Sequence, residues 1–175
     1  MKRKILDCLM ILICFILQTT LFKSLAFASI APNILLIYTV SMGFMQGKKE
    51  GLLVGFFSGL LIDVFYGDLF GFYALIYMYM GYFSGFFCKI YFDEDIKVPM
   101  LLVAGNDLLY SFFVYFTRFM LRGRINLLSY FQSVIMPELV YTVLITIILY
   151  RIFYAINHRL QEKEMKGKRS SWLRG

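Results

Sequence analysis

The sequence predicts an all-α integral membrane protein with about six transmembrane helices. Apolar and aromatic residues make up 60% of the 175 residues, and charged residues make up only 17%, whereas soluble domains carry roughly 25% charge. Several apolar stretches approach the roughly 20 residues that a helix needs to cross a hydrocarbon core about 30 Å thick. So few charged residues could not cover this apolar surface in water. The composition therefore excludes a soluble enzyme domain, a disordered protein and a disulfide scaffold.

Four apolar stretches are long enough for full transmembrane helices, and two between them are shorter. The short ones, Asn33–Gln46 and Gly51–Tyr66, have about 14 and 16 residues and are joined by the polar turn Gly47–Glu50. We interpret them as a tight helical hairpin with the polar turn at its tip; the alternative is a re-entrant pair that never crosses. Either arrangement keeps the number of crossings even. The four long stretches are Ile5–Phe22, Leu69–Cys88, Val98–Leu121 and Val134–Ile156.

Basic residues at the two ends of the chain set the predicted orientation. The net charge is +7, and all of it comes from these ends. Cytoplasmic segments collect Lys and Arg, and with both termini inside, 14 of the 18 basic residues lie on the cytoplasmic side. This predicts a single polytopic membrane domain over residues 1–156 and a basic cytoplasmic tail over 157–175 that touches lipid headgroups. Arg118, Arg122 and Arg124 are discordant, because they fall on the outer side.

The N-terminal segment shares features with a secretory signal peptide. Basic residues, an apolar run and Ala26-Phe27-Ala28 match the order of its regions and its A-x-A cleavage site. However, this apolar run is longer than most such regions, and five more apolar segments follow it. We therefore predict an uncleaved first span.

The sequence shows no arrangement typical of catalytic, metal or cofactor chemistry. The single histidine, His158, lies in the tail, and neither an HExxH nor a GKS/T motif occurs. Cys8, Cys14 and Cys88 lack metal-ligand spacing, and the basic residues form no stripe with base-stacking spacing of the kind that nucleic-acid binding uses. We predict a non-enzymatic protein with no cofactor, no metal and no nucleic-acid partner.

Glycine recurs at every fourth position in the second and third apolar segments. In lipid, small residues at this spacing let two helix backbones approach closely and gain dispersion contacts. The row is either a docking face for another membrane protein or tight packing inside this bundle, and both can hold at once. Its members are Gly43, Gly47, Gly51, Gly55 and Gly59, with Asp63, Gly67 and Gly71 continuing the spacing.

Asp63 lies in this row near the outer end of its span. A carboxylate in a membrane is expensive and normally has a partner. Candidate ion-pair donors are Arg118, Arg122 and Arg124, which are predicted at the same outer face, and Glu138 lies at a similar depth. Asp63 is then a pin for an outer-face partner, part of an internal salt bridge, or a carboxylate capped by backbone N–H groups.

Asn106 and Asp107 lie deeper than the other polar residues. They are about nine residues into their span, which corresponds to about 14 Å at 1.5 Å per residue. With Glu138 they are candidate buried polar residues. Asp107 is either part of a proton or ion relay or a hydrogen-bonded aspartate that faces another helix. A relay normally needs a chain of such groups, and only Asp107 is predicted near the midplane.

The segment from Pro32 to Gly71 resembles the bacterial rod shape-determining protein family MreD. The matching residues are Pro32-Asn33-Ile34-Leu35-Leu36, the glycine row ending in Gly59-Leu60-Leu61-Ile62-Asp63, then Gly67 and Gly71. An even number of spans with both ends inside also matches. Many members have Pro-Asp where this chain has Pro32-Asn33, so a negative charge is missing there.

The resemblance implies a non-enzymatic, multi-pass scaffold in the bacterial cytoplasmic (inner) membrane. Such a protein would work with the single-span protein MreC and the actin-like MreB filaments. A RodA-type glycosyltransferase and a class B penicillin-binding protein would complete this elongation complex, which positions peptidoglycan synthesis. The residues that carry the motif, as a packing or partner interface, would be Pro32, Asn33, Gly55, Gly59, Asp63, Gly67 and Gly71.

The same family is similar in fold to the six-helix substrate-binding subunits (S-components) of energy-coupling-factor vitamin transporters. This similarity provides an alternative function, a substrate-binding membrane subunit of such a transporter. Against it, the first span, Ile5–Phe22, lacks the small-xxx-small pattern with which those subunits dock their coupling partner.

Overall fold

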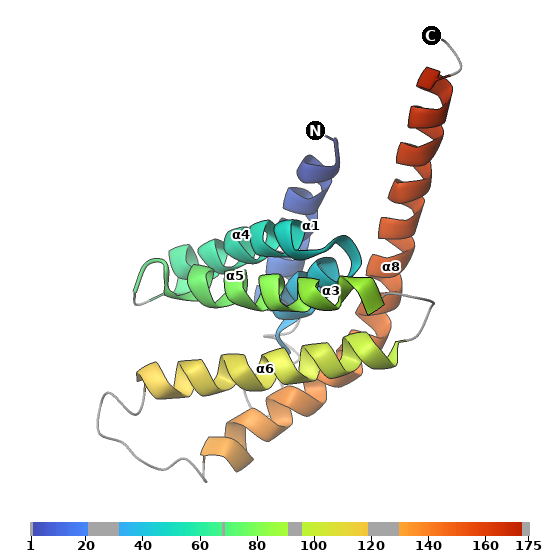
Figure 1. Ribbon diagram of the computed structural model, residues 1–175. Coiled ribbons are helices and arrows are strands. Elements are labelled where there is room, and N and C mark those ends of the chain that lie inside the picture. Colours follow the sequence, from blue (N-terminus) through green and yellow to red (C-terminus); the bar gives the residue numbers. More distant parts are fainter. Residues whose placement is uncertain (1, 21–31, 68, 91–95, 119–129, 173–175) are drawn as a thin grey trace.

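The computed structural model describes residues 2–20, 32–67, 69–90, 96–118 and 130–172, and these residues are helical with short turns and no strand. About six helices were predicted, and this part of the expectation is confirmed (Figure 1). A 3₁₀ turn, η1 (Gly85–Ile90), follows α5, and a π-helical turn, η3 (Phe131–Ile135), precedes α8. The α-helices are α1 (Lys2–Thr19), α3 (Ile34–Gln46), α4 (Lys48–Tyr66), α5 (Phe72–Ser84), α6 (Lys97–Arg118) and α8 (Met136–Trp172).

Helix α3 forms the centre of the bundle. Every residue from Ile34 to Met45 is buried, and α3 contacts α1, α4, α5, α6 and α8. A helix that is apolar all round is stable only when other elements surround it, and these residues carry no charge. With 13 residues, α3 is about 20 Å long, so it is short for a full crossing, as its sequence indicated.

Helices α3 and α4 meet at a single residue, Gly47, and pack against each other as a hairpin. The φ of Gly47 is 97°, a left-handed value that glycine adopts without steric cost. Because the chain reverses at Gly47 alone, α4 begins at Lys48 rather than at Gly51 as expected. Its 19 residues span about 28 Å, so the third helix is longer than the apolar run indicated.

The later helices differ from the predicted spans mainly at their ends. Helix α5 begins only at Phe72, after the left-handed Gly71, and gives way to the 3₁₀ turn at Gly85. The π turn before α8 ends two residues before Pro137, whose missing N–H and bulky ring disfavour a regular α-helical turn on its N-terminal side. Helix α8 continues through Trp172, so it runs across the boundary that we expected at residue 156.

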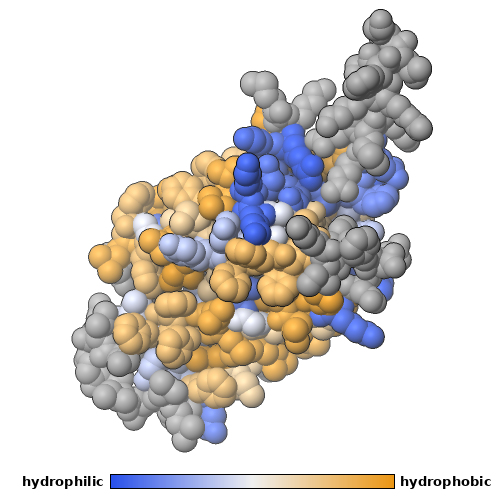
Figure 2. Space-filling model, in the orientation of Figure 1, coloured by the Kyte–Doolittle hydropathy of each residue, from blue (hydrophilic) through white to orange (hydrophobic). Residues whose placement is uncertain are grey.

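The outer surface of the bundle is largely apolar. Large side chains such as Leu101, Phe83 and Ile148 are mostly exposed, and Figure 2 shows apolar residues over the middle of one face with hydrophilic residues gathered toward one end. Within the part of the chain that the structure describes, two helices qualify as membrane spans by length and composition, Lys97–Thr117 and Phe131–Leu160. Two shorter apolar helices accompany them, Ile34–Gln46 and Phe72–Cys88.

Candidate functional site

The glycine row of α4 lies directly against the backbone of α5. A β-carbon on Gly55 would collide with the carbonyl oxygen of Tyr77. One on Gly59 would collide with the carbonyl oxygen of Tyr73 and lie 2.5 Å from the Cα of Ala74. Only glycine permits this approach, and α4 and α5 share the most extensive contact of any two helices in the described structure.

At its other end, the glycine row joins three helices. A β-carbon on Gly51 of α4 would strike the carbonyl oxygen of Gly81 on α5 and lie 2.7 Å from the Cα of Gly43 on α3. Near the end of this interface, Gly85 approaches the backbone of Lys48 closely. The glycine face of α4 is therefore covered by α3 and α5 within this chain.

Asp63 caps the N-terminus of α5. One carboxylate oxygen accepts a hydrogen bond from the backbone N–H of Tyr73 at 2.9 Å, and the other accepts one from the backbone N–H of Ala74 at 2.8 Å. The first N–H groups of a helix have no partner within the helix, and the helix dipole favours a negative charge there. The buried carboxylate of Asp63 (4% exposed) satisfies both requirements.

This geometry corresponds to the backbone-capped arrangement, the third of the three considered for Asp63. Both of its oxygens are used by α5. Of the three candidate arginines, Arg122 and Arg124 lie outside the described residues, and Arg118 is the last residue of α6, with a side chain that is also outside them. Gly67 ends α4 by donating its backbone N–H to the carbonyl of Asp63 at 3.1 Å.

Asn33, next to the buried Pro32, links three helices. Its Oδ1 accepts from the backbone N–H of Leu36 at 3.2 Å, which caps α3, and also from the hydroxyl of Tyr77 on α5 at 2.6 Å. The backbone N–H of Asn33 donates to the hydroxyl of Thr142 on α8 at 3.4 Å. The Pro-Asn motif therefore fixes the start of the central helix to two of its neighbours.

The structure places Asn106 and Asp107 in the interior and Glu138 at a partly buried position on α8. The amide of Asn106 donates to the hydroxyl of Ser84 at 3.3 Å and to the carbonyl of Leu102 at 2.7 Å.

Sequence reasoning missed Tyr77 and Thr142, the two residues on other helices that form hydrogen bonds with Asn33. Together with Asn33, they form a first polar cluster. Tyr77 is fully buried, and its hydroxyl donates to Asn33. The spacing in the sequence contains a signal for each of these two residues. Tyr73 and Tyr77 extend the four-residue spacing of Gly81 and Gly85, and Thr142 lies one turn after Glu138.

A second polar cluster, also missed, lies at the opposite end of the bundle. The guanidinium of Arg3 donates to Oδ1 of Asn157 at 2.9 Å, and the amide of Gln46 donates to the same atom at 3.3 Å. The hydroxyl of Tyr38 donates to Asp7 at 3.3 Å. The two bonds to Asn157 join the beginning of α1, the end of α3 and the later part of α8.

Comparison with known proteins decides the family. The family model described as rod shape-determining protein MreD matches residues 2–159. The chain belongs to the MreD family. No curated protein and no solved structure matches it, so the expected likeness to transporter S-components stays a prediction.

Membership of the MreD family gives this chain a role in determining rod shape and places it among membrane proteins. The apolar helices and the apolar outer surface are those of such a protein. The family also sets the context as the rod-shape complex. In this chain, the motif residues Asn33, Gly55, Gly59 and Asp63 lie at contacts between helices.

Proposed function

We propose that this protein is a non-enzymatic scaffold that binds the single span of MreC and thereby helps position peptidoglycan synthesis along the cell cylinder. The observation that carries the proposal is the family match over residues 2–159. Contacts between helices also support it, because they stabilise a helical framework and do not surround a reacting group. These contacts are made by Asn33, Gly55, Gly59 and Asp63. MreB, a RodA-type glycosyltransferase and a class B penicillin-binding protein are the further partners in this proposal.

The proposed setting is the bacterial inner membrane, with both termini in the cytoplasm and residues 1–156 as the membrane domain. The two polar clusters support the alternation of helix directions that this topology needs. Arg3, Gln46 and Asn157 meet at one end of the bundle. Asn33 and Asp63, which cap the starts of α3 and α5, lie toward the other. The basic residues 157–175 would then face anionic lipid headgroups.

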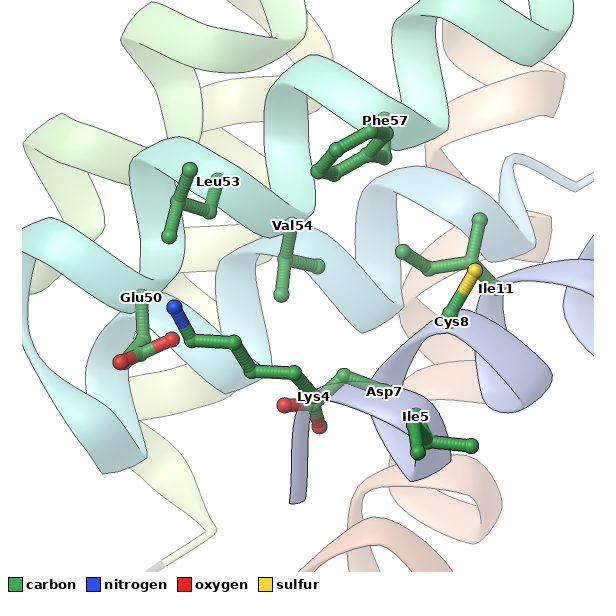
Figure 3. A pocket seen from close by; sticks show the side chains of 9 residues that line it. All are labelled: Lys4, Ile5, Asp7, Cys8, Ile11, Glu50, Leu53, Val54 and Phe57. Carbon is green, nitrogen blue, oxygen red and sulfur yellow. The ribbon is translucent and has the colours of Figure 1, made fainter. Parts of the chain in front are cut away.

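A partner span needs a face that the bundle leaves open. The glycine face of α4 is taken by α5, but the opposite side of α4 forms a groove with α1, with a volume of about 470 Å³. Figure 3 shows side chains from both helices lining it. We name it the α1–α4 groove, and its lining residues are Lys4, Ile5, Asp7, Cys8, Ile11, Glu50, Leu53, Val54 and Phe57.

The chemistry of this groove suits a transmembrane helix with a basic cytoplasmic end. Its walls are apolar, and its charged residues, Lys4, Asp7 and Glu50, lie within the first two turns of α1 and the first turn of α4, which the proposed topology places at the cytoplasmic side. These three residues sum to one negative charge. Single-span proteins carry Lys and Arg at the cytoplasmic end of their span, so the MreC span is the occupant we propose.

The test is co-purification of tagged protein from gently solubilised membranes, combined with depletion in the cell. We expect MreC to be recovered with the tagged protein, and depletion to round the cells. An untagged strain and a tagged, unrelated multi-pass protein are the controls. Recovery of MreC no greater than with the unrelated protein, together with normal cell shape after depletion, would refute the proposal.

A further inference from the structure

We propose that a pocket between α6 and the turn before α8 binds one acyl chain of an anionic phospholipid, with the headgroup phosphate at Arg118. The inference uses the topology proposed above, which places this end of α6 in the outer leaflet. It does not depend on MreC binding, because this pocket and the α1–α4 groove share no helix and no lining residue. We name it the α6–η3 pocket.

The α6–η3 pocket is an apolar cavity of about 280 Å³. Leu109 and Phe112 are 50% and 54% exposed, so the pocket opens on the outer surface of the bundle, whereas Tyr115 and Ile135 are buried. In a membrane this opening faces hydrocarbon, where water is absent, so the space is filled by an apolar chain. The pocket is lined by Leu108, Leu109, Phe112 and Tyr115 of α6 and, across from them, by residues that include Tyr130 and Ile135.

The position of the pocket along α6 corresponds to one leaflet of the bilayer. Tyr115 and Leu108 lie three and ten residues before Arg118, the last residue of α6, or about 5 Å and about 15 Å along the helix. The hydrocarbon core is about 30 Å thick, so the pocket covers about the depth of one acyl chain. The lining residues of α6 occupy only two turns, which is short for a docked transmembrane helix. The occupant that fits is therefore a lipid chain.

Two tyrosines mark the end of the pocket at which a headgroup would lie. The rings of Tyr115 and Tyr130 have centroids 5.1 Å apart. Tyrosine is enriched at the membrane–water interface, where its ring is at headgroup level. Tyr130 directly precedes the π turn Phe131–Ile135, and π turns are rare and frequent at functional sites.

Arg118 supplies positive charge at this end. It follows Tyr115 by three residues, so the two positions lie on the same face of α6. Basic residues are disfavoured on the outer side of a membrane protein, so a positive charge there calls for a role. Asp63, the carboxylate expected to pair with it, accepts instead from the backbone of α5. Because a guanidinium binds phosphate through two parallel hydrogen bonds, a phospholipid headgroup provides that role.

The experiment is native mass spectrometry of the purified, delipidated full-length protein in detergent. The protein is titrated with phosphatidylglycerol, which is anionic, or with phosphatidylethanolamine of the same acyl chains, which is zwitterionic. Leu109→Trp fills the pocket, and Arg118→Gln removes the charge. The matched controls are Phe113→Trp, at a 47% exposed position of α6 that does not line the pocket, and Arg159→Gln, an exposed base on α8.

We expect the first phosphatidylglycerol to bind the wild type about fivefold more tightly than phosphatidylethanolamine, the factor for one basic residue beside an anionic headgroup. Leu109→Trp should lose this first lipid of either kind, and Arg118→Gln should lose only the preference. Both controls should behave as the wild type. Should Leu109→Trp not fold, Leu108→Trp makes the same comparison from a 39% exposed position.

Two results would overturn the proposal. One is equal binding of the two lipids to the wild type, or a preference that Arg118→Gln retains, because the phosphate would then not be at Arg118. The other is lipid binding that filling the pocket leaves unchanged, which is the result expected if residues 119–129 of this chain or a partner protein occupy the pocket.

Discussion

Asp63 at the end of α4 holds the first turn of α5 through the backbone of Tyr73, whose N–H donates to the carboxylate at 2.9 Å. The neighbouring N–H of Ala74 donates to the second oxygen at 2.8 Å. The acid and the glycine row therefore act on the same two helices. The glycines let α4 and α5 approach closely, and Asp63 fixes where along α4 the next helix begins.

Replacing Asp63 tests the cap. Asp63→Leu leaves two buried N–H groups without acceptors and should lower the free energy of unfolding by about 1–3 kcal/mol. Asp63→Asn keeps one acceptor and should lose less. Unfolding of purified protein in detergent measures both, with Glu162→Gln as a control for removal of an exposed acid. Wild-type stability in Asp63→Leu would contradict the assignment.

The glycine contacts are tested by adding one methyl group. Gly55→Ala places a β-carbon against the Tyr77 carbonyl, so α4 and α5 must separate, at a cost of about 1–3 kcal/mol. Gly105 on α6 is the matched control, because a β-carbon there meets nothing within 4 Å. Gly105→Ala should be neutral or stabilise by about 0.5–1 kcal/mol. Equal effects of the two changes on thermal unfolding would show that close approach is not what Gly55 provides.

The bond between Tyr77 and Asn33 can be isolated by a double-mutant cycle. Tyr77→Phe removes the hydroxyl that donates to Asn33 at 2.6 Å, which should cost about 0.5–1.5 kcal/mol. In combination with Asn33→Ala, the two losses should be less than additive. Tyr79→Phe, which changes an exposed tyrosine of the same helix, should have little effect. Strict additivity of Tyr77→Phe and Asn33→Ala would show that the two side chains are not coupled.

The α1–α4 groove makes a prediction about partner binding. Leu53→Trp fills the groove from a partly exposed position, so it should lower the recovery of MreC several-fold without changing the amount of this protein in the membrane. Leu144→Trp, on an exposed face of α8, should leave recovery unchanged. Co-purification followed by immunoblotting measures both. Unchanged recovery with Leu53→Trp at equal protein level would move the binding face elsewhere.

The helices were predictable because each depends on a local run of apolar residues. Helix α6, for example, begins one residue before the expected start at Val98. The start of α4 was not predictable in this way. Lys48–Glu50 are as polar as a loop, and only the left-handed Gly47 shows that the chain reverses before them.

Contacts between residues of different helices were harder to predict than the positions of the helices in the sequence. The glycine spacing indicated close packing of helices, but not that α5 would supply the second backbone. Backbone capping of Asp63 was one of three arrangements that the sequence left open. The sequence could not select it, because the backbone N–H groups that donate to Asp63 carry no signature in the sequence. Tyr77 and Thr142 were missed for a related reason, because their roles depend on Asn33, which is distant in sequence.

The most direct test of the scaffold account is photo-crosslinking in living cells. A benzoylphenylalanine replaces Phe57 in the α1–α4 groove or, as the matched control, Phe113 on α6; the two side chains are 51% and 47% exposed. The account predicts a covalent adduct with MreC from position 57 and none from position 113. An adduct of equal yield at both positions, or none at position 57 while MreC still co-purifies, would contradict it.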